Sequence, residues 1–345
     1  MQQKKILVCG SGGMIGTHLT NRLKEQGHYI VGVDIKYNEF HTSTADEFII
    51  QDLSDQTATY HLIVDGQFDE IYNLAAVMGG MEYLANGEND YEVLMYSTLI
   101  NWNILEAAVD SGVPKIFFAS SACAYNMTLQ EQPDVPALKE SDAYPVLPDL
   151  EYGYQKLITE RMYMAAERCH GIQVRIARFH NIYGPYTEWH GTKAKAPAAL
   201  CRKVAEGIHN DMTHGDAINL INNAGVLPIS IPNTIAVIGD GLQTRSFTWI
   251  DDCIDGIQKL MDSDCNEPIN IGSSEMIAIN DLAKLIISIS GKNLTINNIE
   301  GPQGVRGRNS DNTMILEKLG WEPTTKLADG IPQLYKWVSE QVQKQ

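Results

Sequence analysis

Short apolar runs alternate along the first half of the chain with longer segments in which apolar residues recur every three to four positions. Such runs are typical of buried strands, and the recurring pattern is typical of amphipathic helices. The predicted strands are 5–9, 29–34, 47–50, 70–74, 116–119 and 174–178, and the helices between them include 17–25, 91–111 and 154–169. Strands that alternate with helices predict an α/β fold with a doubly wound parallel sheet.

The pattern changes after residue 185. A polar stretch, 186–195, precedes a predicted helix at 197–207, and Gly, Asn and Pro punctuate 209–233 so closely that we expect a loop there. Beyond it lie predicted strands 235–238, 246–250 and 268–271, and predicted helices 251–261, 280–290, 312–319 and one from about 330. We expect a larger unit from 1–181 and about 240–266, and a smaller one from about 182–239 and 267–345, with 210–233 as an inserted loop.

The amino-acid composition limits the classes of partner that this protein can bind. The 345 residues carry a formal net charge of −17, which argues against nucleic acid or an anionic membrane as partner. No apolar run is long enough to span a bilayer, and the N-terminus lacks the apolar core of a signal peptide. Six cysteines without a C-x-x-C pair are typical of reduced thiols, so we expect a soluble, cytoplasmic protein, and we assign no metal site.

A glycine-rich run follows the first strand and opens the first helix: Gly10-Ser-Gly-Gly13-Met14-Ile15-Gly16. Glycines in this context allow a helix N-terminus to approach a pyrophosphate, as in Rossmann folds. Asp34 ends the second strand, about 20 residues on, where a carboxylate binds a ribose diol and repels a 2′-phosphate. These features predict NAD rather than NADP as cofactor.

Two further segments are candidate cofactor contacts. Asp52, followed by Leu53, ends the third strand and could meet the adenine, although a solvated acid at a strand end is an equal alternative. Small residues near Ala75 suit close passage of a cofactor, but tight packing of helix on sheet would also explain them.

Tyr152 and Lys156 are four residues apart, a spacing that places both on one face of a helix. The lysine ammonium would lower the pKa of the Tyr152 phenol, which could then take a proton from a substrate alcohol. Ser120 and Ser121 end a strand at the carboxyl edge of the sheet, where such folds bind ligands. Each signal alone has a plain alternative, two polar residues opening a helix, but their order on a dinucleotide-binding chain favours hydride transfer.

Cys123 follows these serines, and Lys195 precedes the helix at 197–207. A lone cysteine is usually a small buried hydrophobe, but Cys123 lies close enough to Ser121 to act on the same substrate. A cation at a helix N-terminus opposes the helix dipole, so Lys195 is either a functional lysine, a ligand for an anion, or a solvated loop residue. Arginine guanidinium groups can bind the oxygens of a diphosphate in pairs. Candidates for this role occur at three places: Arg202-Lys203, Arg245, and Arg306 with Arg308.

With these residues assembled, the chain resembles the extended short-chain dehydrogenase/reductases and, among them, the GDP-mannose 3,5-epimerases. The resemblance runs from about residue 4 to 342. It rests on long strings: Met78-Gly-Gly-Met81, Ser120-Ser-Ala-Cys123, Arg178-Phe-His-Asn-Ile-Tyr-Gly-Pro185, Lys195-Ala-Pro-Ala-Ala199, Gly239-Asp-Gly-Leu-Gln-Thr-Arg-Ser-Phe-Thr248 and Gly304-Val-Arg-Gly-Arg-Asn-Ser-Asp-Asn312.

The resemblance implies roles for the matching residues. Tyr152 would be the base for hydride transfer, Lys156 its partner on the nicotinamide ribose, and Ser121 the hydroxyl on the reacting oxygen. Cys123 and Lys195 would be the acid/base pair at C5 and C3. The implied substrate contacts are Gly79, Ser121, Ala122, Cys123, Asn181, Ala194, Lys195, Ala196, Lys203, Gln243, Thr244, Arg245, Arg306 and Arg308.

The resemblance therefore implies an NAD-dependent isomerase of GDP-mannose that works by transient oxidation at C4, and a homodimer. Two features depart from the family: an insertion between Lys203 and Gly239, and an end soon after the last helix. The alternatives are another nucleotide-sugar enzyme (a 4-epimerase, a dehydratase or a GDP-heptose 4-dehydrogenase) and a non-catalytic NAD-binding scaffold. A 4-epimerase has no need of Cys123 and Lys195, and a scaffold typically lacks the Tyr/Lys pair.

Overall fold

A seven-stranded parallel sheet forms the larger part of the molecule, in a computed structural model that describes residues 2–85, 87–207 and 233–345. The strand order is β11-β6-β5-β4-β1-β2-β3. The strands are β1 (Lys5–Cys9), β2 (Tyr29–Asp34), β3 (Glu47–Ile50), β4 (Glu70–Asn73), β5 (Lys115–Ser121), β6 (Gln173–Phe179) and β11 (Ile269–Ile271). The predicted doubly wound fold is confirmed. The sheet includes β11, which the sequence analysis assigned to the smaller unit.

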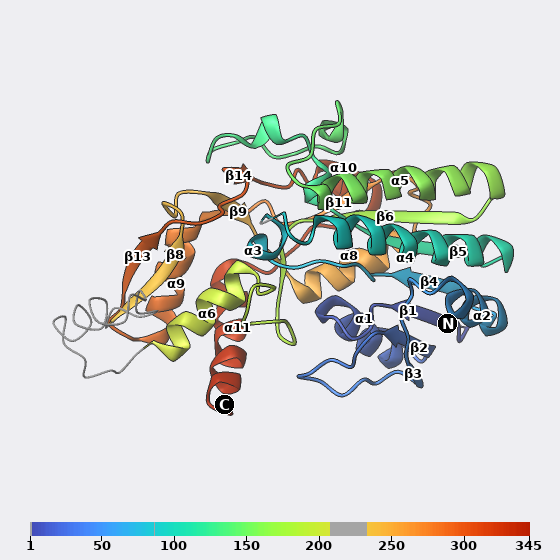
Figure 1. Ribbon diagram of the computed structural model, residues 1–345, viewed down its shortest axis with the longest axis horizontal. Coiled ribbons are helices and arrows are strands. Elements are labelled where there is room, and N and C mark those ends of the chain that lie inside the picture. The colour runs from blue at the N-terminus through green and yellow to red at the C-terminus, as the bar shows by residue number, and fades with distance from the viewer. Residues whose placement is uncertain (1, 86, 208–232) are drawn as a thin grey trace.

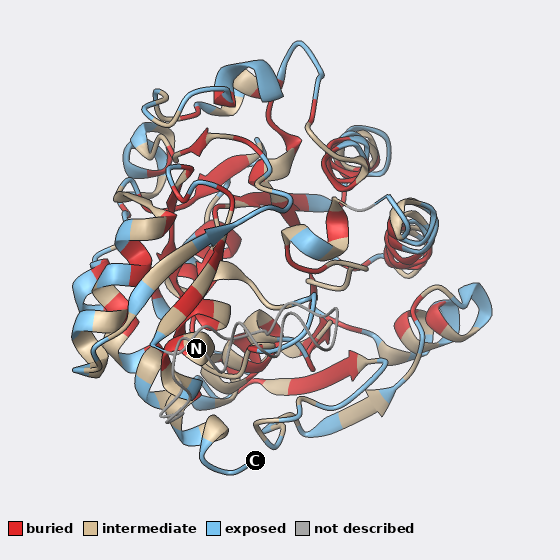
Figure 2. Cartoon of the chain, turned by 60° about the vertical axis from the view of Figure 1, so that its left-hand side comes forward, coloured by how far each residue is buried: buried red, intermediate tan, exposed pale blue. Residues whose placement is uncertain are grey.

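Helices cover both faces of this sheet (Figure 1). The helices are α1 (Met14–Glu25) and α8 (Ile250–Asp262) on one face, and α2 (Gln56–Gly66), α4 (Asp90–Asp110) and α5 (Glu151–His170) on the other. Successive side chains of β1 point to opposite faces, so Ile6 and Val8 join the first cluster whereas Leu7 and Cys9 join the second. Burial on both faces explains why these strands read as unbroken apolar runs. Figure 2 shows the buried residues concentrated in the strands and on the inner faces of helices.

Most of the remaining elements gather beside the sheet, on the left in Figure 1, whereas α10 lies near the centre, beside α5. A three-stranded sheet joins β12 (Met276–Ala278), β9 (Thr244–Ser246) and β14 (Gly307–Arg308), and a pair joins β8 (Thr234–Ile238) to β13 (Thr295–Ile299). The helices are α6 (Ala196–Glu206), α9 (Ile279–Ser290) and α11 (Leu327–Val342); α10 (Thr313–Leu319) packs near β11, and the single turn α3 (Met81–Leu84) follows β4. No described helix is long and apolar enough to cross a membrane.

The pattern-based assignments err where elements are short. The predicted strand 246–250 is divided: β9 ends at Ser246, β10 (Thr248–Trp249) pairs with β7 (Ile182–Tyr183), and α8 begins at Ile250. Helix α5 begins at Glu151 rather than at 154, and therefore contains Tyr152. Strands β12, β13 and β14 were not predicted, because two to five residues show too little periodicity. The predicted loop 210–233 lies, apart from Asn233, outside the described residues.

Candidate active site

Tyr152 and Lys156 lie on successive turns of one face of α5, as their spacing predicts. The Lys156 Nζ atom is 5.5 Å from the centroid of the Tyr152 ring and 4.9 Å from that of Phe118. It donates a hydrogen bond to the backbone oxygen of Ala119, 2.8 Å away. Lys156 is almost fully buried, and burial lowers its pKa to about 7. The ammonium is thus held between α5 and the carboxyl end of β5.

The expected lowering of the Tyr152 pKa is not found. Burial raises the pKa of the Tyr152 phenol, the nearby Cys123 raises it further, and only a hydrogen bond with Ser121 opposes the shift. The interpretation from spacing was incomplete because it weighed the lysine charge without the desolvation of the phenol. Tyr152 is therefore a protonated, buried phenol in the ligand-free protein.

Ser121 and Cys123 stand where β5 ends and a short 3-10 turn, residues 122–124, begins. The Cys123 amide donates to Ser121 Oγ over 3.1 Å, which fixes the turn. A Cβ atom at Gly153 would lie 2.1 Å from the Cys123 backbone oxygen, so this turn and the first turn of α5 are in direct contact. Ser120 is directed elsewhere, since its Oγ donates to Glu160 Oε1 over 2.5 Å.

A buried arginine faces the thiol. Arg308, on β14, places Nη1 3.2 Å from Cys123 Sγ. Its other nitrogens donate to Gln130 Oε1 (2.5 Å) and to Asp149 Oδ2 (3.4 Å). Burial would lower the pKa of Arg308, but Cys123 and Asp149 reverse the direction, and the net shift is upward. The site thus contains a permanent cation beside the sulfur.

Lys195 is the N-cap residue of α6 and lies within electrostatic range of Cys123. Its Nζ has no hydrogen-bond partner within 2–85, 87–207 and 233–345. Burial lowers the pKa of Lys195, while Cys123 and Cys253 oppose that shift. The preceding backbone is fixed from the other side, because a Cβ atom at Gly80 would be 2.5 Å from the Ala194 oxygen. Lys195 and Tyr152, from two different elements, therefore both lie within electrostatic range of Cys123 on a third.

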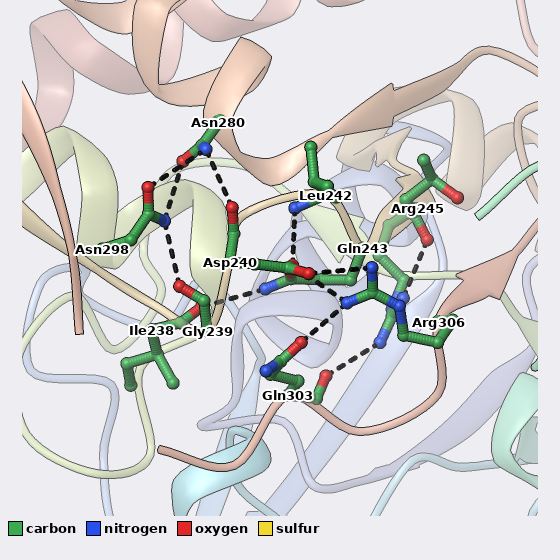
Figure 3. Close-up of polar contacts among 11 residues, drawn as sticks. Ile238, Gly239, Asp240, Leu242, Gln243, Arg245, Asn280, Asn298, Gln303 and Arg306 are labelled. Carbon is green, nitrogen blue, oxygen red and sulfur yellow. Dashed lines mark hydrogen bonds and ion pairs between the residues drawn. The ribbon is translucent and has the colours of Figure 1, made fainter. Parts of the chain in front are cut away.

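Arg245 and Arg306, two of the predicted diphosphate contacts, differ in how their charge is balanced. Arg245 is buried and donates only to backbone oxygens, those of Thr244 (2.8 Å) and Gln303 (3.2 Å). Burial and the neighbouring Arg308 lower its pKa to about 9. Arg306 donates to both carboxylate oxygens of Asp240, at 2.9 and 3.0 Å (Figure 3). Arg245 is the guanidinium whose charge lacks a hydrogen-bonded carboxylate among the described residues.

Most other predicted substrate contacts border the same cleft through backbone interactions. Lys203 Nζ donates to the Ala236 oxygen (2.7 Å), and Asn181 Nδ2 donates to the Ser246 oxygen (2.8 Å). Gln243 Nε2 donates to the Ile238 oxygen, and its buried Oε1 has no partner among the described residues (Figure 3). Thr244 Oγ1 donates to the Pro133 oxygen. The remaining ones are Gly79 beside Tyr83, the buried Ala122, and Ala194 and Ala196 on either side of Lys195.

The glycine-rich turn fits a pyrophosphate. Gly10 has φ +81°, and a Cβ atom there would lie 2.9 Å from the Ala75 nitrogen. No side chain caps the N-terminus of α1, so the amides of Met14, Ile15 and Gly16 remain available to an anion. A Cβ atom at Gly13 would meet nothing closer than 3.4 Å, which leaves room beside this turn. The donors and the space match what a dinucleotide requires.

Asp34 and Asp52, the two acidic residues predicted to bind the cofactor, differ in burial and in hydrogen bonding. Asp34 Oδ2 accepts from the Gly12 amide (3.0 Å), and burial raises the pKa of this carboxyl against its hydrogen bonds. Asp52 is exposed and its Oδ1 accepts from the Ser54 amide, whereas Leu53 is buried. Ala75 lies beside Gly10, and its amide donates to Asn73 Oδ1. Asp34 is thus built into the glycine-rich turn, and Asp52 caps a neighbouring one.

Residues that sequence reasoning missed hold this site together. Gln130 and Asp149 orient Arg308 from the irregular connection between β5 and α5, where no periodic pattern marks them. Glu160 binds Arg178 through two hydrogen bonds of 2.8 and 2.7 Å in the core. Its position, four residues after Lys156 on the same helix face, was the signal that could have identified it.

Comparison with known proteins gives a consistent result over the whole chain. GDP-mannose 3,5-epimerase 1 of Oryza sativa subsp. indica is 44% identical over 100% of this chain and 84% of its own length. The GDP-mannose 3,5-epimerase of Arabidopsis thaliana is 43% identical over 99% of this chain and 84% of its own length. UDP-glucuronic acid decarboxylase 5 of the same plant is 26% identical over 95% of this chain and 87% of its own length.

Solved structures agree in fold. UDP-glucose 4-epimerase of Thermotoga maritima, with UDP-glucose, superposes with a TM-score of 0.79 at 23% identity, over 98% of this chain and 99% of that one. UDP-glucuronic acid 4-epimerase of Bacillus cereus, with UDP-glucuronic acid and NAD, gives 0.78 at 25% identity over the same shares. The model of the NAD dependent epimerase/dehydratase family matches residues 6–272, which span the glycine-rich turn, the Tyr152/Lys156 pair and Lys195. The chain belongs to the NAD dependent epimerase/dehydratase family.

Proposed function

We propose that this chain is an NAD-dependent GDP-mannose 3,5-epimerase. The observation that carries the proposal is that a thiol, Cys123, lies near the Tyr152 phenol, and that Lys195, whose Nζ has no hydrogen-bond partner among the described residues, lies within electrostatic range of the same thiol. Hydride transfer alone needs the tyrosine but neither of the other two. Relatives 43–44% identical over essentially the whole chain are GDP-mannose 3,5-epimerases, which supports both the sugar and the nucleotide.

The reaction begins at the C4 hydroxyl. Tyr152, once deprotonated, takes the hydroxyl proton, while Ser121 donates a hydrogen bond to the same oxygen as it becomes a carbonyl. The glycine-rich turn and Asp34 would hold NAD, which would supply the acceptor for the C4 hydride. Lys156, whose Nζ is 5.5 Å from the centroid of the Tyr152 ring, would contact the nicotinamide ribose beside the phenol. The resulting 4-ketone makes the hydrogens on C5 and C3 acidic.

Proton exchange follows at the two carbons beside the ketone. Cys123, as a thiolate, removes the proton from C5, and Lys195, as an ammonium, delivers one to the opposite face, which inverts that carbon. Once Cys123 has released its proton to solvent and Lys195 has taken one up, the same exchange inverts C3. Arg308 stabilises the thiolate from 3.2 Å, and the lowered pKa of Lys195 makes its proton easier to give. Return of the hydride to C4 closes a cycle without net oxidation.

The buried arginine on β9 supports a diphosphate substrate. Arg245 has only backbone acceptors, and an unpaired guanidinium in the interior is costly until an anion meets it. A diphosphate oxygen would supply that charge with the geometry a guanidinium prefers. We therefore assign Arg245 to the diphosphate and Arg308 to the thiol.

The test is deuterium exchange followed by NMR, with GDP-mannose in D₂O. The wild-type enzyme should incorporate solvent deuterium at C5 and C3, and Cys123→Ala should lose this incorporation while it still oxidises C4, seen as enzyme-bound NADH. Cys169→Ala is the matched control, because Cys169 is exposed and remote from the site. Undiminished incorporation by Cys123→Ala would exclude the thiol as the base. A wild-type enzyme that inverts only C4 would instead be a 4-epimerase.

We also propose that the chain forms a homodimer through α4 and α5. These helices lie side by side (Figure 1), and α4 exposes a large apolar stripe at helical spacing: Tyr91, Met95, Leu99 and Trp102. Ile158 extends it on α5, 55% exposed. A contiguous exposed apolar face of this kind is typical of an interface between subunits. A second copy would meet the same face by two-fold symmetry.

A cytoplasmic location is proposed on the state of the thiols. All six cysteines lie in described parts of the chain and all are free, although Cys9, Cys201, Cys253 and Cys265 are buried. Free thiols in this number suit a reducing compartment. Cell fractionation tests this proposal. Recovery of the protein in the fraction that contains a cytosolic marker would support the location, and recovery with secreted proteins would contradict it.

A further inference from the structure

The segment 185–188, which leads to Lys195, is attached to the dinucleotide-binding turn. Asn38, in the connection between β2 and β3, donates from Nδ2 to three oxygens: Gly12 O (3.0 Å), Thr17 Oγ1 (3.2 Å) and Tyr186 O (3.2 Å). One amide thus joins the glycine-rich turn to the start of α1 and to the segment that precedes Lys195. We call these contacts, with those described next, the latch.

Three other contacts join the same two parts of the chain. Lys36 Nζ is 3.0 Å from Glu188 Oε1, and a His18 ring nitrogen is 3.3 Å from the Pro185 oxygen. The Tyr186 ring lies against the rings of His18 and His41, with centroids 5.1 and 4.6 Å apart. Lys36 follows shortly after Asp34, so the latch begins next to the carboxylate expected to hold the ribose.

The backbone of Tyr186 depends on these contacts. Its φ is +62°, a left-handed conformation that costs a bulky residue free energy and persists only where neighbours enforce it. Asn38 and the two histidines supply that enforcement. Loss of the latch would let Tyr186 return to an ordinary conformation, which would redirect the chain that follows it.

The other end of this chain segment is fixed to a different part of the cofactor cleft. The Ala194 oxygen packs where Gly80 has no Cβ, and Gly80 follows the strand that leads past Ala75. Lys195 is therefore held between two anchors, both on segments that border the dinucleotide turn. A displacement of about 1 Å in a reacting group lowers rates by roughly a hundredfold, so these anchors decide whether Lys195 reaches its carbon.

We propose that Asn38 is a positioning residue through which dinucleotide binding and the placement of Lys195 are coupled. NAD on the glycine-rich turn orders Asn38 and the latch, and the latch orders residues 185–195. By linkage, an ordered latch raises the affinity for NAD by the same free energy, and gains in affinity usually appear as slower release. Such coupling would keep the cofactor in place through a cycle that returns its hydride. The catalytic part rests on the proposed function; the coupling itself does not.

The test is hydrogen exchange of the backbone amides of 186–195, with NAD present and absent and without any sugar. NAD should slow this exchange in the wild-type protein. In Asn38→Ala the effect on 186–195 should vanish, while NAD still protects residues 10–16. Ser43→Ala is the matched control, because Ser43 lies in the same connection and its Oγ accepts from the Ala45 amide, outside the latch.

A second variant separates the latch from a direct effect on the glycine-rich turn. Tyr186→Ala changes neither partner of the Asn38–Gly12 hydrogen bond, and it removes the ring that packs against His18, His41 and Trp337. We expect NAD to dissociate about tenfold faster from both Asn38→Ala and Tyr186→Ala than from wild type, a change typical of one lost buried contact. Unchanged release from Tyr186→Ala, or NAD-dependent protection of 186–195 that survives in Asn38→Ala, would overturn the coupling whatever the substrate.

Discussion

A buried lysine can be indispensable to a reaction and still destabilise the protein. Lys156 has a pKa of about 7 in the folded state and the ordinary value of 10.5 when unfolded. Between these values the unfolded chain binds one proton more, so this residue's contribution to stability rises with pH across that window. Below about pH 7 both states are protonated, and the full cost of the buried ammonium is present.

Lys156→Met should therefore abolish activity and stabilise the ligand-free protein. The gain in free energy of unfolding should be roughly 2 to 3 kcal/mol larger at pH 6 than at pH 9. Urea unfolding at the two pH values measures it. A gain that is equal at both pH values would show that the ammonium does not carry the cost.

Arg308 gives a second residue-level prediction. Its guanidinium stabilises negative charge on Cys123 from 3.2 Å, so Arg308→Met should slow alkylation of Cys123 by iodoacetamide at pH 7 by about tenfold. Arg306→Met is the matched control, since Arg306 is paired with Asp240 (Figure 3). Labelling can be followed by mass spectrometry of the peptide that contains Cys123. An equal rate in both variants would assign the thiol's reactivity to another group.

Individual residues were predictable where their chemistry is local. Tyr152 and Lys156 share a helix turn, and Cys123 is two residues from Ser121, so spacing alone places each pair together. The hydrogen bonds of Arg308 with Gln130 and Asp149 join residues that are far apart in the sequence, and no sequence pattern relates these positions. The direction in which the Tyr152 pKa shifts could be determined only from the structure. Burial decides this direction, and burial is a property of the whole fold.

At the scale of elements, the turn between β8 and β9 presents Gln243 and Arg245 to the cleft. Asp240 shapes this turn: it accepts from the Leu242 amide (2.9 Å) and pairs with Arg306 from the β13–β14 connection (Figure 3). Asp240→Ala should raise the KM for GDP-mannose several-fold with little change in kcat, because the elements that bind the nucleotide loosen while the reacting groups stay in place.

Asp255→Ala is the control for this change, since Asp255 on α8 forms a comparably exposed ion pair with Arg22 on α1, away from the turn. Steady-state kinetics of both variants, with GDP-mannose varied, separates the two parameters. A fall in kcat with KM unchanged would mean that Asp240 acts on the chemistry instead.

Long elements were predictable and short ones were not. The buried strands of the parallel sheet are apolar on both faces, and their helices keep a 3.6-residue period over several turns. Strands β9, β10 and β14 have only two or three residues, and pairing partners distant in sequence decide their existence. The smaller sheet that carries Arg245 and Arg308 therefore could not be predicted from the sequence and was found only in the structure.

At the scale of the molecule, the groups proposed to act in the reaction come from two different sheets. Tyr152, Lys156 and Cys123 belong to the parallel sheet and its helix, whereas Arg245 and Arg308 belong to the smaller sheet. Lys195 lies on the connection between them. The division into two units stays a prediction, but the distribution explains why motifs spread over most of the chain were needed to recognise one site.

The apolar stripe on α4 yields the prediction at this scale. Trp102 is 53% exposed and Tyr91 67% exposed, so a charged residue at either position meets water in a monomer and costs little. In a dimer through α4 and α5, the same charge would be buried against its symmetry mate without a partner. Trp102→Glu should therefore produce a folded monomer, measured by light scattering after gel filtration, with circular dichroism as the check on folding.

Leu316→Glu provides the matched control, since Leu316 is 47% exposed on α10, a different surface helix. This variant should keep the mass of the wild-type protein. A wild-type chain that is already monomeric at micromolar concentration would refute the dimer, and a Trp102→Glu variant that stays dimeric would place the interface on another surface. Because α5 also carries Tyr152 and Lys156, a loss of activity in the monomeric variant would further show that the partner subunit stiffens the catalytic helix.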